Sequence, residues 1–248
     1  MMTGFGSSSI VHRPPSIVQM LLHAQNIVKF YGLRPVLRGA SLAVDGGEFV
    51  AMLGANGSGK STLLRVLATL GRPEKGSLEI CGVDALAHGD LAREHIGVVM
   101  HQSMLYPDLS AKENLMFHAR LHGLADAPAR VTRALERVNL AARADDPARM
   151  FSRGMIQRLT LARVLLQNAQ VILLDEPFTG LDAASAQNLS ILLMELAAGG
   201  KAIVMTTHEQ RGMEGVTRVV RLEEGKLTED GRPKTVAMPV PRLPSPVS

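Results

Sequence analysis

The chain has 248 residues, of which 46% are hydrophobic, and a formal net charge of +4 at pH 7. This length suits one α/β domain, or one domain with a subdomain, and the modest charge is spread along the chain and does not indicate nucleic-acid binding. The single cysteine, Cys81, excludes an internal disulfide, is predicted to be a buried core residue, and fits a reducing, cytoplasmic compartment. No apolar run approaches the roughly 20 residues that cross a bilayer, so work at a membrane requires another chain to hold the protein there.

The two ends of the chain have the composition of flexible segments. Residues 1–20 are rich in Gly, Ser and Pro near their start and lack the apolar stretch of a signal peptide. We therefore expect a disordered N-terminal extension, or a true start at Met20. Residues 232–248 contain five prolines and are expected to form a Pro-rich flexible tail. The globular part is predicted to span residues 21–231.

The first part of the globular region has β patterning. Strands are expected at residues 21–31 and at about 40–44, and a turn at 45–47 leads into an apolar strand at 49–53. A helix follows the glycine-rich segment after that strand. Two more strands are then expected at the ranges 77–81 and 95–101.

The middle of the chain is helical, and the last third returns to strands. Residues 108 to about 167 have helical spacing interrupted at Gly123, Pro128 and Pro147, which predicts an inserted helical subdomain at about 104–167. The continuous apolar run at 171–174 predicts a strand buried on both faces. After it we expect a helix with an inner leucine stripe, a second buried strand and a closing hairpin, at residues 183–198, 202–205 and 218–227.

A glycine-rich segment carries the strongest chemical signal. The residues Gly54-Ala55-Asn56-Gly57-Ser58-Gly59-Lys60-Ser61 match the pattern G-x-x-x-x-G-K-[ST], between a strand and a helix that begins with Thr62. Glycines let backbone N–H groups turn inward toward an anion, and the helix adds its positive end. Lys60 supplies charge for the β- and γ-phosphates, and the Ser61 hydroxyl can ligate Mg²⁺. This phosphate-binding loop, residues 54–61, predicts a nucleoside triphosphate site.

Three later strand ends carry polar residues that suit phosphate hydrolysis. Asp175 and Glu176 follow the buried strand at 171–174, where Asp175 would hold Mg²⁺ and Glu176 would accept a proton from, or orient, the attacking water. His208 ends the next strand and can contact the γ-phosphate. Gln102, at a third strand end, suggests a contact with Mg²⁺ or water. Without the phosphate-binding loop, each would be read as an ordinary strand-end or loop residue.

Tyr31 lies at the end of the first expected strand and has two interpretations. Its ring could stack on adenine, or it could pack against the strand. The residue alone does not decide between them.

The order of these motifs resembles that of an ATP-binding-cassette (ABC) ATPase over about residues 21–226. The resemblance implies an α/β fold: a P-loop NTPase core with a mostly parallel sheet, an N-terminal antiparallel β subdomain and the inserted α-helical subdomain. It also implies roles for single residues: Tyr31 as the adenine-stacking aromatic, Gln102 as the Q-loop residue, Asp182 as the D-loop acid and His208 as the switch histidine.

The signature segment departs from the family pattern. Leu-Ser-Gly-Gly-Gln is usual, and here the chain reads Phe151-Ser152-Arg153-Gly154-Met155. By resemblance, Ser152 and Gly154 touch the γ-phosphate of ATP bound by the opposite subunit. Arg153 replaces the first glycine, whose lack of a side chain allows a close approach of the backbone in the family pattern. Met155 removes an amide group that helps to order the signature helix. We expect ATPase activity to survive both changes.

The resemblance also implies cofactors and partners. Two such subunits, expected to be a homodimer, sandwich two ATP molecules with Mg²⁺, and hydrolysis reopens the dimer. A transmembrane permease subunit would dock in the groove beside Gln102 and the helical insertion, so that membrane contact is indirect. This implies a peripheral position on the cytoplasmic face of the inner membrane, with no nucleic acid as partner.

Three stretches are similar to those of the ATPases of cytochrome c maturation haem exporters: residues 67–73, 101–115 and 151–155. General drug or lipid exporters share much of this pattern. The chain itself is expected to bind no haem.

Two other function classes compete with a transport ATPase. A soluble ABC ATPase acting on nucleic acid or ribosomes is disfavoured by the single P-loop and single cysteine. A regulatory subunit that barely hydrolyses ATP is favoured weakly by Arg153 and Met155 but disfavoured by Glu176 and His208.

Overall fold

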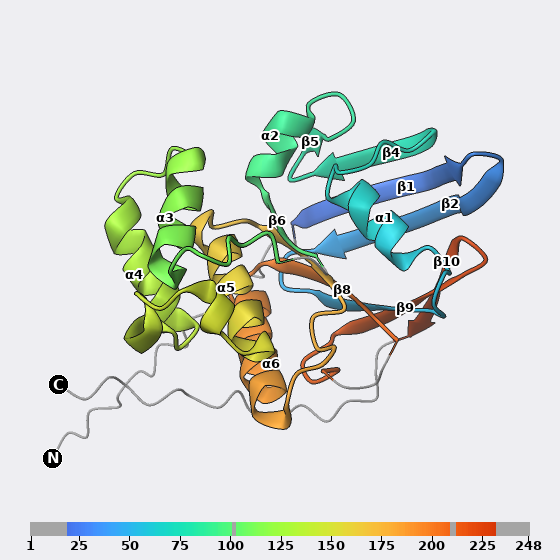
Figure 1. Cartoon of the computed structure of the whole chain (residues 1–248). Coiled ribbons are helices and arrows are strands. Elements are labelled where there is room, and N and C mark those ends of the chain that lie inside the picture. The colour runs from blue at the N-terminus through green and yellow to red at the C-terminus, as the bar shows by residue number, and fades with distance from the viewer. Residues whose placement is uncertain (1–18, 101–102, 209–211, 232–248) are drawn as a thin grey trace, which may run out of the picture.

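Two β-sheets lie side by side in the computed structural model, which describes residues 19–100, 103–208 and 212–231 (Figure 1). The expectations for the N-terminal extension up to residue 18, for the tail 232–248 and for Gln102 lie outside the described residues. The smaller sheet is antiparallel, as predicted. Its strand order is β2 (Arg34–Asp45), β1 (Met20–Tyr31), β4 (Lys75–Ile80) and β5 (Val83–Asp84).

The larger sheet is parallel except for its edge strand β10, and it carries the phosphate-binding loop at the end of β3. The continuous apolar sequences of β7 and β8 fit strands that are buried on both faces. The strand order is β10 (Lys226–Gly231), β9 (Arg218–Glu223), β3 (Phe49–Leu53), β8 (Ala202–Thr207), β7 (Val171–Asp175) and β6 (Ile96–Val99).

The larger sheet separates two hydrophobic cores. Alternate residues of β3 point to opposite faces: Val50 and Met52 join the core shared with α1 (Lys60–Leu67) and the antiparallel sheet. Phe49 and Ala51 join the core on the helical side. The larger sheet therefore fixes α1 on one face and the long C-terminal helices on the other.

The helical insertion lies between β6 and β7, as the sequence predicts, and stands apart from the antiparallel sheet in Figure 1. The helix α3 begins at a capping box in which Ser110 and Glu113 satisfy each other's backbone N–H groups. In the described ranges no helix is long and apolar enough to span a membrane. The remaining helices are α2 (Gly89–Glu94), α3 (Ala111–Leu121), α4 (Ala127–Arg137), the short 3₁₀ turns η1 (Ala141–Arg143) and η2 (Ala148–Met150), α5 (Arg153–Leu166) and α6 (Ala183–Ala198).

Most predicted elements are confirmed, and the differences have local causes. The second strand begins at Arg34 instead of residue 40, because β2 follows β1 after a tight turn and Gly39, at φ +96°, lets the strand continue through an irregular register. The strand expected at 77–81 is β4, which runs from Lys75 to Ile80, and the strand expected at 95–101 is β6, which is shorter and runs from Ile96 to Val99. The sequence missed β5 and α2, which are too short for a periodic pattern.

Cys81 is half-buried and is not part of the fully buried core, contrary to the prediction. It has φ +50° and begins the turn between β4 and β5. Its partial burial raises the pKa of the thiol. Four leucines of α6 do form the predicted buried stripe: Leu189, Leu192, Leu193 and Leu196.

Candidate active site

The phosphate-binding loop connects the C-terminal end of β3 to α1, and close neighbours require glycine at two of its positions. A Cβ atom at Gly54 would lie 2.6 Å from the carbonyl oxygen of Leu222. At Gly59, the residue before α1, φ is +108° and a Cβ would lie 3.2 Å from the carbonyl oxygen of Val36. The sequence therefore folds here into a turn that brings the backbone to the start of α1, whose first N–H groups have no helical partner.

Lys60 carries a buried positive charge inside this turn. Its side chain is only 6% exposed, and Nζ donates to the carbonyl oxygens of Gly54 at 2.7 Å and Ala55 at 3.1 Å. Within the described residues, no carboxylate forms an ion pair with Lys60. The hydroxyl of Ser58 is buried without a hydrogen-bond partner there. An unpaired cation, an orphaned hydroxyl and a helix N-terminus together fit a phosphate group.

Asp175 lies beside the loop, held by two hydroxyl groups. Ser61 Oγ donates to Asp175 Oδ1 at 3.2 Å, and Thr206 Oγ1 donates to the same oxygen at 2.7 Å. The parallel register of β7 and β8 pairs Asp175 with Thr206. A carboxylate next to a serine hydroxyl is a donor set that suits Mg²⁺. No group of three or more His, Cys, Asp and Glu side chains able to hold a metal occurs in the described ranges.

Glu176 follows Asp175 in a left-handed backbone conformation with φ +50°, which turns its carboxylate away from the strand. Its N–H group donates to Thr206 Oγ1 at 3.0 Å and lies 3.2 Å from the Thr206 carbonyl oxygen. The carboxylate is held from both sides: Oε1 lies 3.1 Å from His208 Nδ1, and Thr179 Oγ1 donates to Oε2 at 3.4 Å. The structure therefore brings Glu176 and His208 together, as their strand-end positions suggested.

The residues attributed to the opposite nucleotide lie at two helix N-termini. Ser152 caps α5 by accepting a hydrogen bond from Met155 N at 3.3 Å. Asp182 caps α6 through Ser185 N at 2.7 Å, and this hydrogen bond lowers the pKa of the Asp182 carboxyl. Gly154 is buried, and a Cβ there would lie 2.5 Å from Ser185 Oγ. No hydrogen bond or ion pair joins Ser152, Gly154 or Asp182 to the phosphate-binding loop in the described part of the chain.

Tyr31 ends β1 and is 54% exposed, so its ring does not pack into the core. Lys29 Nζ lies 5.9 Å from the ring centroid. An exposed ring is available for stacking.

Two residues that position the carboxylates were given no role by the sequence reasoning. Thr206 and Thr179 hold Asp175 and Glu176, yet each looks in the sequence like an ordinary strand or loop residue. No sequence signal marks Thr206, because the register that sets it opposite Asp175 is visible only in the folded sheet.

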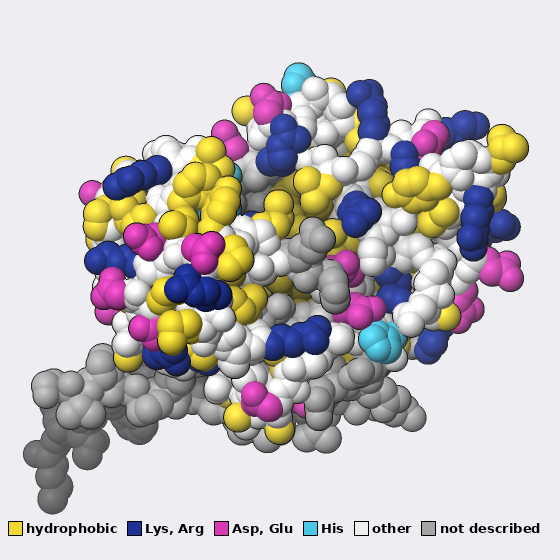
Figure 2. Space-filling model, viewed as in Figure 1, with side chains coloured by type: hydrophobic (Ala, Val, Ile, Leu, Met, Phe, Trp, Pro, Cys, Tyr) yellow, Lys and Arg dark blue, Asp and Glu magenta, His cyan; other side chains and the backbone are white. Residues whose placement is uncertain are grey.

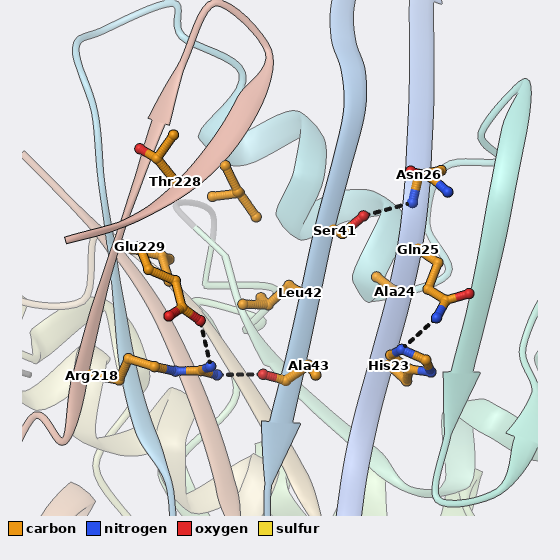
Figure 3. A pocket seen from close by; sticks show the side chains of 12 residues that line it. His23, Ala24, Gln25, Asn26, Ser41, Leu42, Ala43, Arg218, Thr228 and Glu229 are labelled. Atoms are coloured by element: carbon orange, nitrogen blue, oxygen red, sulfur yellow. Dashed lines mark hydrogen bonds and ion pairs between the residues drawn. The ribbon is translucent and has the colours of Figure 1, made fainter. Parts of the chain in front are cut away.

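A hollow of about 360 Å³ lies away from these residues, between the antiparallel sheet and the β9–β10 hairpin (Figure 3). Arg218 enters it from β9 and contacts Glu229 and the Ala43 carbonyl oxygen, while Asn26 N donates to Ser41 Oγ at 2.9 Å. No residue of the phosphate-binding loop lines this hollow. Its cation, Arg218, is already paired with Glu48 and Glu229. The hollow is therefore separate from the site described above.

Comparison with known proteins places this geometry in a family. The sequence model described as "ABC transporter" matches residues 37–179, which include the phosphate-binding loop, Asp175 and Glu176. The chain belongs to the ABC transporter family. It is 39% identical over 215 residues to the Nod factor export ATP-binding protein I of Burkholderia thailandensis, covering 86% of this chain and 71% of that protein.

A second relative of this ABC ATPase is a larger protein. The macrolide export ATP-binding/permease protein MacB 1 of Aeromonas hydrophila is 39% identical over 222 residues, which is 86% of this chain but only 33% of that protein. The chain therefore spans a third of that relative's length.

Solved structures show the same fold. The ATP-binding subunit of an ABC transporter matches with a TM-score of 0.78 and 29% identity, covering 86% of this chain and 90% of the other. A post-hydrolysis dimer of an ATP-binding cassette bound to ADP and Pi matches with a TM-score of 0.79 and 26% identity, covering 87% and 100%. The predicted fold class is confirmed, and the chain is an ATPase of the kind that couples ATP hydrolysis to transport.

Proposed function

We propose that this chain is the ATP-hydrolysing subunit of an ABC exporter that powers a separate transmembrane subunit. The observation that carries the proposal is the Glu176 carboxylate, held between His208 and Thr179 next to the Asp175–Ser61 pair. A merely nucleotide-sensing subunit does not require such a carboxylate. The names of the relatives from B. thailandensis and A. hydrophila, both of which include the word export, support the direction of transport.

In this proposal the chain's own residues divide the work at one nucleotide. The glycine-rich backbone of residues 54–59, the Lys60 ammonium group and the N-terminal N–H groups of α1 at Ser61 and Thr62 bind the phosphates. Ser61 and Asp175 would hold Mg²⁺, which would supply positive charge to the phosphate oxygens. Glu176 accepts a proton from the attacking water or orients it, and His208 contacts the γ-phosphate while touching Glu176.

A second copy of the chain completes the site. Ser152 and Gly154 of one subunit face the γ-phosphate bound by the other, and Asp182 meets the partner near its phosphate-binding loop. Tyr31 stacks on adenine, which its exposed ring permits. Gln102, outside the described residues, remains assigned to Mg²⁺ or water.

The helical insertion is the proposed binding surface for the transmembrane partner. Large hydrophobic side chains are exposed around α3, and Figure 2 shows hydrophobic side chains gathered over this helix. Tyr106 and Phe117 contact each other edge-to-face with ring centroids 5.1 Å apart. The exposed residues are Met104, Tyr106, Phe117 and Leu121. A surface of this kind suits a protein partner, which would hold the subunit on the cytoplasmic face of the membrane.

The identity of the transported substrate is the most specific part of the proposal. The stretches at 67–73, 101–115 and 151–155 carry the haem-exporter hypothesis, and the names of the compared relatives give it no support. A tagged pull-down from detergent-solubilised membranes, with and without ATP, tests it. Recovery of a cytochrome c assembly subunit would support the haem-exporter hypothesis, whereas another permease would keep only the exporter ATPase. Recovery of ribosomes or nucleic acid alone would contradict the transport proposal.

The activity itself is tested by comparing the wild type with Glu176→Gln. We expect a loss of turnover of about 10²–10⁴-fold, because the substitution removes a proton acceptor while keeping the shape of the side chain. ATP binding should persist, and the variant should accumulate as an ATP-bound dimer. Glu223→Gln, in an exposed side chain of β9, is the matched control and should hydrolyse ATP at the wild-type rate. Wild-type turnover by Glu176→Gln would contradict the proposed role.

A further inference from the structure

Arg153, one of the residues that depart from the family pattern, lies with its guanidinium group directly over Gly180. A Cβ atom added at Gly180 would lie 2.4 Å from Arg153 Nη1 and 2.6 Å from Arg153 Cζ. Gly180 also has φ +71°, a backbone conformation that favours glycine. The side chain of Arg153 forms no hydrogen bond or ion pair with any other described residue. The first residue of α5 therefore packs its planar side chain on the backbone of the loop that follows β7.

That loop, residues 176–182, is a folded unit that begins with the catalytic carboxylate of Glu176. Thr179 N donates to the Glu176 carbonyl oxygen at 3.2 Å, and Leu181 N donates to the Phe178 carbonyl oxygen at 3.2 Å. The side chains of Phe178 and Leu181 are buried. Thr179, the neighbour of Gly180, also donates its hydroxyl to Glu176 Oε2 at 3.4 Å. A displacement at Gly180 would therefore move a residue that holds Glu176.

We propose that Arg153 is a positioning residue that holds the 176–182 loop and, through Thr179, keeps the Glu176 carboxylate in its working position. The contacts Arg153–Gly180 and Thr179–Glu176 join the signature segment to the catalytic carboxylate within one subunit. This inference rests on the proposed function, because it requires Glu176 to act on the attacking water. Arg153 makes no hydrogen bond or ion pair with the phosphate-binding loop of its own subunit, so we expect its effect on the chemical step to exceed its effect on ATP binding.

The first test is steady-state ATP hydrolysis by the full chain. For Arg153→Ala we expect kcat to fall about tenfold, because a small displacement of a catalytic group is costly. The KM for ATP should stay within about twofold of the wild-type value. Arg153→Lys, whose long side chain can still reach Gly180 but lacks the planar guanidinium group, should recover part of the lost kcat. Arg149→Ala is the matched control, since Arg149 is an exposed arginine just before α5 that pairs with Asp108, and it should leave both constants unchanged.

A double-mutant cycle with Gly180→Ala isolates the contact from backbone strain. Alanine at Gly180 is strained in either background, but its Cβ collides with the guanidinium group only when Arg153 is present. We therefore expect Gly180→Ala to lower kcat less in the Arg153→Ala background than in the wild type, with thermal midpoints recorded for all four proteins. Equal effects of Gly180→Ala in both backgrounds, or wild-type kcat for Arg153→Ala, would overturn the inference. If Glu176→Gln hydrolysed ATP normally, the proposed function would fail first, which keeps the two failures distinct.

Discussion

His208 Nδ1 lies 3.1 Å from Glu176 Oε1, although the two residues are 32 positions apart, because each follows the end of one of two neighbouring parallel strands. This contact orients the carboxylate, and the proposed function adds a second role for His208, contact with the γ-phosphate. For His208→Ala we expect turnover to fall about 10–100-fold with ATP binding retained, because the carboxylate keeps Thr179 as its other partner. Phosphate release and ATP binding, measured on the same preparations, check this. A loss of ATP binding as large as the loss of turnover would contradict it.

Thr206 connects the two acidic residues through one hydroxyl group that donates to Asp175 and accepts from Glu176 N. It is fully buried, so Thr206→Val would leave the Asp175 oxygen and the Glu176 N–H group with one partner fewer. We expect a loss of about 1–3 kcal/mol in the free energy of unfolding, together with reduced ATP turnover.

Thr206→Ser keeps the hydroxyl and serves as the control. It should retain most of the turnover that Thr206→Val loses. If both variants lost turnover equally, packing of the methyl group, and not the hydrogen bonds, would explain the effect.

His118 makes the stability of the helical insertion depend on pH. Burial, and next the guanidinium group of Arg163, lower the pKa of His118 from 6.5 to about 4. Between these values the unfolded chain binds the proton more tightly, so the free energy of unfolding should fall as the pH drops from about 6.5 to about 4. Above pH 6.5 this group should have no effect.

Thermal midpoints of the wild type and His118→Gln across pH 4–8 test this dependence. The variant should lose less stability on acidification, because glutamine does not titrate. His88→Gln, in an exposed histidine before α2, should behave like the wild type. Parallel pH profiles for the wild type and His118→Gln would rule out the proposed cause.

Gly97 in β6 allows the central sheet to pack closely on α5. A Cβ there would lie 2.2 Å from Val164 Cγ1 and 3.2 Å from Ala169 Cβ. We expect Gly97→Ala to lower the free energy of unfolding by about 1–3 kcal/mol, because the β-branched, buried Val164 cannot turn away. Unfolding followed by far-UV circular dichroism suits this chain, which has no tryptophan.

Combining Gly97→Ala with Val164→Ala provides the check on this packing argument. Removing Cγ1 makes room for the new methyl group, so the double variant should lose less stability than the sum of the two single losses. Additive losses would show that the two side chains do not compete for the same space.

The sequence was sufficient for features that repeat or that follow a fixed spacing. The phosphate-binding loop, the buried runs of β7 and β8 and the leucine stripe of α6 each have a pattern with a physical cause, and each lies where it was predicted. The first half of β2 was missed because Pro35 and Gly39 are typical of turns, and α2 because six residues show no helical period.

The supporting residues of the site could not be predicted for a different reason. Thr206 meets Asp175 because of the sheet register, and Arg153 meets Gly180 through packing across 27 positions of sequence. Neither relationship has a characteristic spacing. A lone threonine or arginine becomes informative only when the tertiary structure shows which group it contacts.

The close packing of β2 against the phosphate-binding loop has a further consequence. Val36 of β2 lies against Gly59, and Arg38 N donates to the Gly225 carbonyl oxygen at 2.8 Å, so the antiparallel sheet is joined to both the loop and the β9–β10 hairpin. Tyr31 ends the strand paired with β2. These contacts therefore set the distance between the Tyr31 ring and the phosphate-binding loop. A nucleotide whose base stacks on Tyr31 must match that distance with the length from its base to its phosphates. This selection requires no movement of a helical segment.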